Sequence, residues 1–260
     1  MQTWVNKPSK NYSVTPTDNF ISHLIELRDR LLRIVLGFIV VFIGFFPFAN
    51  KIYALLAQPL LSKLPAGGQM IATAVTTPFF VPMKVAMMAA FIVSLPHTLY
   101  QVWSFVAPGL YAHEKKFMIP IIIASSLLFL SGMAFAYFAV FPVIFGFIVG
   151  SAPQGVAVMT DIGNYLDFVL TLFFAFGLAF EVPIAVVMAV RFGWVTTKAL
   201  QEIRGYVIVA AFIIGAIFTP PDVVSQFMLA VPMWLLYELG IIVSKFTQKA
   251  PEQTILPPSA

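Results

Sequence analysis

Long apolar runs that are almost free of charge alternate with short polar segments along most of this chain. The runs occupy residues 34–49, 77–103, 117–141, 162–190, 205–218 and 222–244. A helix rises 1.5 Å per residue, so about 20 apolar residues cross the ~30 Å hydrocarbon core of a bilayer. The pattern therefore predicts six transmembrane helices and an all-α membrane protein.

Two boundaries in this pattern depend on proline and glycine. The uncharged stretch from Phe117 to Thr160 is too long for one helix, and Pro142 and the glycines at 150 and 155 divide it. We expect the third span to end near Phe141 and a loop to cover 142–161. Residues 50–76, with turn-forming prolines and glycines, are predicted to be a second loop that has room for short interfacial helices.

An amphipathic helix is predicted just before the first span. Leu24, Leu27 and Leu31 fall at helical spacing over residues 20–33, and Asp18 suits the N-cap. The flanking residues 1–19 and 246–260 are polar or rich in proline and are predicted to be disordered tails. The predicted membrane domain therefore covers residues 20–245.

The last two helices are expected to be short, and the fifth run is short for a membrane span. Its 14 residues make a helix of only about 21 Å. Either the bilayer thins locally, or tilted neighbours and a loosely placed boundary absorb the mismatch. The sequence leaves both readings open.

Charge and composition agree with a membrane protein and set its orientation. Apolar residues make up 60% of the chain and charged residues only 10%. There is no Cys, which excludes disulfides and thiolate chemistry. Most of the 15 Lys and Arg residues fall on one side of the predicted spans, so both termini are expected in the cytoplasm and the positive net charge needs no nucleic-acid partner. These residues are Lys7, Lys10, Arg28, Arg30, Arg33, Lys115, Lys116, Arg191, Lys198, Arg204, Lys245 and Lys249.

Glu181 lies well inside the fourth run. A charged group at mid-bilayer costs about 2.5–3.5 kcal/mol on insertion scales, so this side chain must face protein or water. It is either a functional group or a hydrogen-bonded carboxyl that stabilises packing. Lys84 lies near the outer end of its span, where its long side chain can reach the interface.

Two carboxylates on the cytoplasmic side form a candidate binding site. Glu26 and Glu114 lie close to an anionic membrane surface, where an acidic side chain has no anchoring purpose. Carboxylates pair with guanidinium groups through two parallel hydrogen bonds, so a cationic ligand with arginines is the expected partner. Glu26 is also spaced to form an i,i+4 pair with Arg30.

Other polar groups have structural readings. Asp222 and Gln226, one turn apart after residues 219–221, open the last span, where capping and function are equally favoured. Glu238 is expected at the interface. The scattered histidines indicate no metal site, and the sequence lacks a P-loop and the common hydrolase signatures, so we expect no cofactor, no catalysis and no use of ATP.

Four segments, taken together and in order, resemble the TatC family, a subunit of the twin-arginine (Sec-independent) protein translocase. They are HLIELRDRL at 23–31, YQVWSFVAPGLYAHEKK at 100–116, FEVP at 180–183 and TPPDVVSQ at 219–226. Each is weak alone, but their order on a six-span frame is specific. The resemblance covers roughly residues 20–245.

The resemblance implies a concave, glove-like bundle in the bacterial plasma (inner) membrane, among its lipids. Such a subunit receives Arg-Arg signal peptides of folded precursor proteins, works with the single-span subunits TatA and TatB, is a homo-oligomer within a TatBC complex, and uses the proton motive force.

The resemblance also implies roles for individual residues. Glu26 and Glu114 would hold the two arginines of the signal peptide, and Glu181 would meet a partner helix in the concave face. Other matching positions would shape the cytoplasmic surface (Arg28, Leu31, Phe105), the extracytoplasmic cap (Pro59) and the outer end of the last hairpin (Asp222, Gln226).

Two other functions are consistent with parts of the sequence. A proton-coupled small-solute permease would use Glu181 as its titrating group. An intramembrane hydrolase is disfavoured because no nucleophile and base pair is present.

Overall fold

The computed structural model describes residues 16–64, 68–106, 118–153, 159–219 and 222–247 of the chain, and nearly all of them are helical. The long helices are α1 (Pro16–Phe45), α3 (Thr77–Val106), α4 (Met118–Phe135), α6 (Ile162–Arg191) and α9 (Val223–Thr247). The shorter elements are a 3-10 turn (Phe46–Phe48), α2 (Ala49–Leu61), a π-helical turn (Ala136–Val140), α5 (Phe141–Gly150), α7 (Thr197–Glu202) and α8 (Arg204–Phe218), with two strands, β1 (Met70–Ile71) and β2 (Thr160–Asp161).

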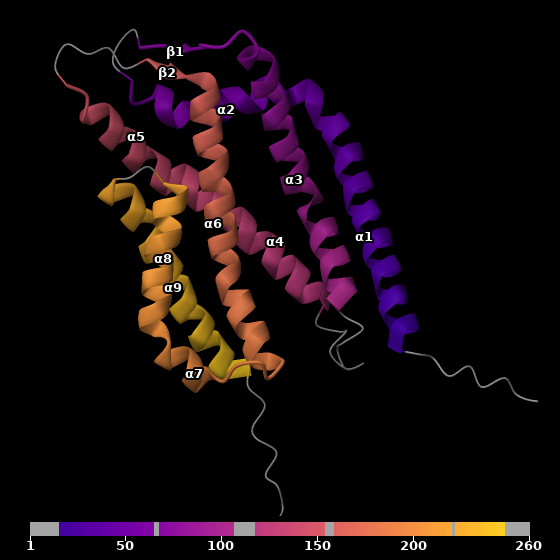
Figure 1. Cartoon of the computed structure of the whole chain (residues 1–260). Coiled ribbons are helices and arrows are strands. Elements are labelled where there is room, and N and C mark those ends of the chain that lie inside the picture. Colours follow the sequence, from indigo (N-terminus) through magenta and orange to yellow (C-terminus); the bar gives the residue numbers. More distant parts are fainter. Residues whose placement is uncertain (1–15, 65–67, 107–117, 154–158, 220–221, 248–260) are drawn as a thin grey trace, which may run out of the picture.

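Five helical stretches of the described chain are long and apolar enough to cross a membrane, and α8 is a shorter apolar helix. With α8 they make six crossings, which confirms the predicted fold class. Helix α1 stands at one edge against α3, α6 lies in the middle against α4 and α9, and the α8–α9 hairpin forms the other edge (Figure 1). Helix α1 begins and α9 ends at the same end of the bundle, here called the inner end.

The main core is rich in phenylalanine and lies between α2, α3, α4, α5 and α6. Phe141 and Phe176 are fully buried, and the Phe141 ring packs at a tilt against Phe173, with 5.1 Å between ring centroids. Glycines allow the close crossing of α4 and α6, because a Cβ on Gly177 would come within 2.5 Å of the Phe129 ring. Small residues have this function in many membrane bundles.

The loop expected over 142–161 is wrong for its first part. The chain stays helical from α4 through the π-turn and α5 as far as Gly150. Pro142 sits in the first turn of α5, where a missing N–H is tolerated, and the π-turn just before it relaxes the hydrogen-bond ladder. The fully buried Ile144 then packs in the core and stabilises this extra helix.

Three other boundaries differ from the expected ones. Residues 50–76 were expected to be a loop with short interfacial helices, but α2 is a helix of 13 residues. It is longer than expected because Leu56, Ala57 and Leu60 on one face are buried in the core. Helix α1 begins inside the segment expected as a tail, at Pro16, and α9 continues to Thr247. With 25 residues α9 is a full-length span, so of the last two helices only α8 is short and the expectation for the last one is wrong. Prolines and polar residues at helix ends blur such boundaries.

A cap covers the outer end of the bundle. Strands β1 and β2 pair in parallel, with Met70 opposite Thr160, and lie above α2 (Figure 1). Two tyrosines fasten α2 from below, since Tyr165 donates to the Leu56 carbonyl at 2.6 Å and Tyr137 to the Leu55 carbonyl at 2.8 Å.

Hydrogen bonds join the short helix α8 to α9 at its inner end and again just beyond its middle. At the inner end, Arg204 donates to both carboxylate oxygens of Glu238, each at 2.7 Å. Towards the outer end, the Gln226 amide donates to the Phe212 carbonyl at 2.9 Å. The hairpin is therefore held as one unit.

Candidate functional site

The cytoplasmic candidate Glu26 lies on α1 next to the end of α3. The carboxylate accepts two hydrogen bonds from Arg30, from Nε at 2.9 Å and from Nη2 at 2.5 Å, and this confirms the predicted i,i+4 pair. His23 Nδ1 is 3.8 Å from the other carboxylate oxygen. The His23 ring stacks on Phe105 of α3 at 4.4 Å between centroids, so Glu26 and Phe105 belong to one surface.

The other predicted members of this surface are only partly brought together. Arg28 is exposed and pairs with its neighbour Asp29, with its Nη2 at 2.8 Å from Oδ1, rather than with Glu26. Leu31 is exposed on α1. Glu114 lies outside the described residues, so its placement beside Glu26 stays a prediction.

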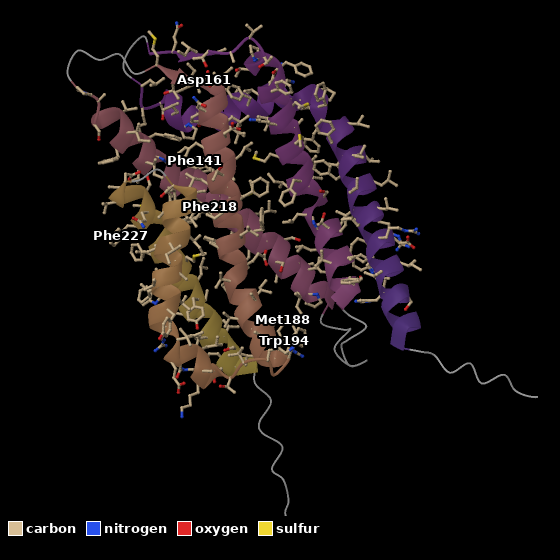
Figure 2. All side chains as sticks on the ribbon, viewed as in Figure 1. Phe141, Asp161, Met188, Trp194, Phe218 and Phe227 are labelled. Atoms are coloured by element: carbon tan, nitrogen blue, oxygen red, sulfur yellow. The ribbon has the colours of Figure 1, made fainter. Side chains whose placement is uncertain are left out.

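Glu181 lines a cavity of about 510 Å³ in the inner half of the bundle. The cavity is bounded by α3, α4, α6 and the turn after α6, and Figure 2 shows Met188 and Trp194 at its inner limit. Glu181 makes a side-chain hydrogen bond with Ser125 of α4. Its second oxygen, Oε1, is buried and has no hydrogen-bond partner among the described residues.

The cavity wall is otherwise mostly apolar. The lining residues are Phe91, Leu95, Thr98, Leu99, Val102, Ser125, Phe129, Leu178, Glu181, Ile184, Ala185, Met188, Phe192 and Trp194. A single carboxyl in such a wall suits an apolar ligand with one polar group, such as a helix with a polar side chain.

Three predicted residues near the outer end have structural contacts. Asp222 caps α9, because its Oδ1 accepts the Ser225 N–H at 2.7 Å, and Gln226 bonds the two helices of the last hairpin. Pro59 is buried within α2. These contacts support the capping reading of Asp222, and a direct part in transport stays a prediction for all three.

Sequence reasoning missed an ion pair between α3 and α6. Lys84 Nζ lies 2.5 Å from Asp167 Oδ1, and both side chains are partly exposed in the outer half of the bundle. The two residues are a similar number of turns from the outer ends of their helices, Thr77 and Ile162. That matched depth was a signal in the sequence that could have predicted the pair.

Asp161, also missed, organises the cap. Its Oδ1 accepts the N–H groups of Gly163 and Asn164, and its Oδ2 accepts the N–H and hydroxyl of Thr73 at 2.9 and 2.7 Å. The hydrogen bond from the Asn164 backbone and those from Thr73 lower the pKa of this carboxyl to about 2. A single Asp before a helix predicts a cap but not the contact with residue 73.

A search of the described residues finds no group of three His, Asp or Glu that could hold a metal ion.

Comparison with known proteins identifies close relatives over most of the chain. The family model of Sec-independent protein translocase protein (TatC) matches residues 22–232. The protein of that name in Escherichia coli K12 is 51% identical over 234 residues, which are 90% of this chain and 91% of the relative. The one in Azotobacter chroococcum is 54% identical over 221 residues, 85% of this chain and 87% of the relative.

A solved structure is similar as well. The crystal structure of the twin-arginine translocase receptor TatC superposes with a TM-score of 0.77 at 38% identity, over 87% of this chain and all of that chain. The sequence relatives named above are bacterial proteins. Helical bundles, unlike β-barrels, belong to the bacterial inner membrane, so the predicted localisation is confirmed.

Proposed function

The chain belongs to the TatC family of Sec-independent protein translocase proteins, and we propose on this premise that it binds the Arg-Arg signal peptides of folded precursor proteins at its cytoplasmic surface. It is a translocase receptor subunit, and the proposed role requires binding but no catalytic residue. Glu26 and Glu114 would accept the two guanidinium groups, and the peptide would commit its precursor to export.

The single observation that supports this proposal most is the surroundings of Glu26. Its carboxylate is about a third exposed at the inner end of α1, within reach of solvent and of a ligand. The stacked rings of His23 and Phe105 stand beside it. A carboxylate with an aromatic wall is a good receptor for arginine, since the guanidinium group both pairs with carboxylates and stacks on rings.

We further propose that single-span TatA and TatB subunits dock on this chain, with several copies in one complex, and that the proton motive force drives export. Glu181 supports a docking site for a partner helix, because this residue carries the one carboxyl among the described residues that line a mostly apolar cavity. A polar side chain on that helix would hydrogen-bond with the carboxyl, and removing the pair would weaken assembly.

The test is charge-sensitive crosslinking of an Arg-Arg signal peptide to the full chain in membranes. Replacing Glu26 and Glu114 by Gln is expected to reduce crosslinking about tenfold or more, because each charge-assisted pair contributes about 1.5–3 kcal/mol. Asp29→Asn is the matched control, since it removes one negative charge from the same helix turn but not from the site. Unaltered crosslinking in the Glu26→Gln/Glu114→Gln chain contradicts the proposal.

A second candidate function follows from the same cavity. A proton-coupled permease for small solutes would use Glu181 as its titrating group, and a volume of about 510 Å³ is large enough for a solute. Reconstituted vesicles that contain only this chain discriminate the two. Solute uptake that is lost in Glu181→Gln favours the permease, and absence of uptake favours the export receptor.

A further inference from the structure

Two arginine–carboxylate pairs in this molecule differ in geometry. Between α8 and α9, Arg204 engages both oxygens of Glu238, one with Nε and one with Nη2. On α1, Arg30 places both Nε and Nη2 on the same oxygen of Glu26, Oε1. The second oxygen of Glu26 faces His23 Nδ1 at 3.8 Å, beyond hydrogen-bond distance.

We propose that Arg30 is an internal substitute for the ligand's arginine: it occupies Glu26 in the free protein and is displaced when a signal peptide binds. The inference rests on the proposed function, because it assumes that Glu26 accepts a guanidinium group from outside. It adds that Arg30 sets both the affinity of the site and its preference for arginine over lysine.

The open oxygen of Glu26 gives the ligand a point of entry. An incoming guanidinium group can bind Oε2 first, beside the His23 ring that stacks on Phe105. Two parallel bonds to the carboxylate also require Oε1, which Arg30 holds. A planar, forked guanidinium can replace Arg30 on equal terms, whereas the ammonium of a lysine makes a point contact and competes less well.

The strength of the resident pair limits the size of the effect. Pairs at i,i+4 on a helix surface are weak, and this one is only partly shielded, since the Arg30 and Glu26 side chains are 19% and 34% exposed. Removal of Arg30 is therefore expected to tighten binding by about two- to fivefold, and not by orders of magnitude. Such a modest reduction of affinity by Arg30 is compatible with a receptor that must release its ligand.

The experiment measures binding of a fluorescent Arg-Arg signal peptide, and of its Lys-Lys version, to the full chain in nanodiscs. Arg30→Gln should bind the Arg-Arg peptide about two- to fivefold more tightly than wild type, and its preference for Arg-Arg over Lys-Lys should fall. In a Glu26→Gln background the same substitution should have no effect, because the shared carboxylate is gone.

Arg33→Gln is the matched control. It removes the same unit charge from the same helix, three residues further on, where the carboxylate of Glu26 is not contacted. Arg33→Gln should change the affinity for the Arg-Arg peptide less than twofold. A larger increase in affinity in Arg30→Gln is then caused by loss of the Arg30–Glu26 pair and not by the change in net charge. Arg30→Lys keeps the charge but loses the forked guanidinium group, so it should tighten binding by a factor between those of wild type and Arg30→Gln. This variant replaces Arg30→Gln in the experiment if Arg30→Gln folds poorly.

The outcomes separate this inference from the proposed function. If wild type binds Arg-Arg peptide, Glu26→Gln weakens binding and neither Arg30 variant strengthens it, Arg30 is no competitor and the inference is overturned. If wild type and Glu26→Gln bind both peptides alike, the receptor proposal itself is contradicted. Equal tightening in Arg30→Gln and Arg33→Gln would assign the effect to charge alone and also overturn the inference.

Discussion

At the scale of single residues, Asp161 shows how one carboxylate can tie together segments far apart in sequence. It accepts four hydrogen bonds, two from the first turn of α6 and two from Thr73 in the segment after β1. Thr73 lies 88 residues away. The carboxylate thus both caps a membrane helix and fixes the outer loop above it.

Asp161→Asn is expected to loosen the cap at neutral pH, because an amide oxygen is a weaker acceptor and its NH₂ group cannot accept at all. The folded-state pKa of Asp161 is about 2, below its ordinary value of 3.8, so the stabilisation is fully present above about pH 4 and is lost as pH falls towards 2. Thermal unfolding in detergent should show a lower midpoint for Asp161→Asn than for wild type at pH 7, and this difference in midpoint should become smaller in acid. A difference that stays constant down to pH 3 contradicts the stabilising role of the ionised carboxylate. The double variant Asp161→Asn/Asn164→Asp, which moves the carboxylate three residues along the chain, should be no more stable than Asp161→Asn if the position of the charge matters.

At the scale of helices, the sequence predicted spans well and their partners poorly. Apolar runs predict spans because lipid requires apolar side chains all around a helix, whatever its neighbours are. Pro142 was misread as a terminator because local rules do not include the buried Ile144 beyond it. The matched depth of Lys84 and Asp167 in their spans indicates that the two could pair, but no local pattern says that α3 and α6 are neighbours.

The same limit applies to the candidate site. Glu26 and its pairing with Arg30 were predictable, since both lie on one helix. The stacking of His23 on Phe105 joins two helices and was not predicted. Glu181 was predictable from its cost in lipid, whereas its bond with Ser125 depends on the crossing of α4 and α6.

The Lys84–Asp167 pair is expected to stabilise α3 against α6. The two side chains are 41% and 57% exposed, so Lys84→Gln or Asp167→Asn should each destabilise the chain by up to about 1 kcal/mol. The exchange Lys84→Asp/Asp167→Lys should restore most of that loss. Unfolding in nanodiscs measures the effect, and single variants as stable as wild type would show that the pair contributes nothing.

At the scale of the whole molecule, the length of α8 does not match the thickness of the bilayer's hydrocarbon core. Its 15 residues span only about 22 Å, and its fastening to α9 at Arg204 and Gln226 prevents it from sliding to another depth. Both readings of the mismatch, a thinner bilayer and cover from neighbouring helices, are tested by changing its length.

Inserting four leucines between Tyr206 and Val207 lengthens α8 by about 6 Å. If the thin region serves passage of cargo, export of a folded reporter with an Arg-Arg signal should be abolished while the chain still inserts in the membrane. The same insertion after Val40 of α1, a helix exposed along one side, is the control and should be tolerated better. Full export by the α8 variant would dismiss thinning as a requirement.

The helical continuation beyond Phe135 has a mechanical consequence. From Met118 to Gly150 the chain forms a nearly continuous rod of about 50 Å, far longer than the bilayer core is thick. Such a rod must run obliquely, as Figure 1 shows, and it meets α6 midway. Because α4 contacts both α3 and α6, we expect this rod to hold the two helices apart under lateral pressure from the surrounding lipids and so to keep the cavity beside Glu181 from closing.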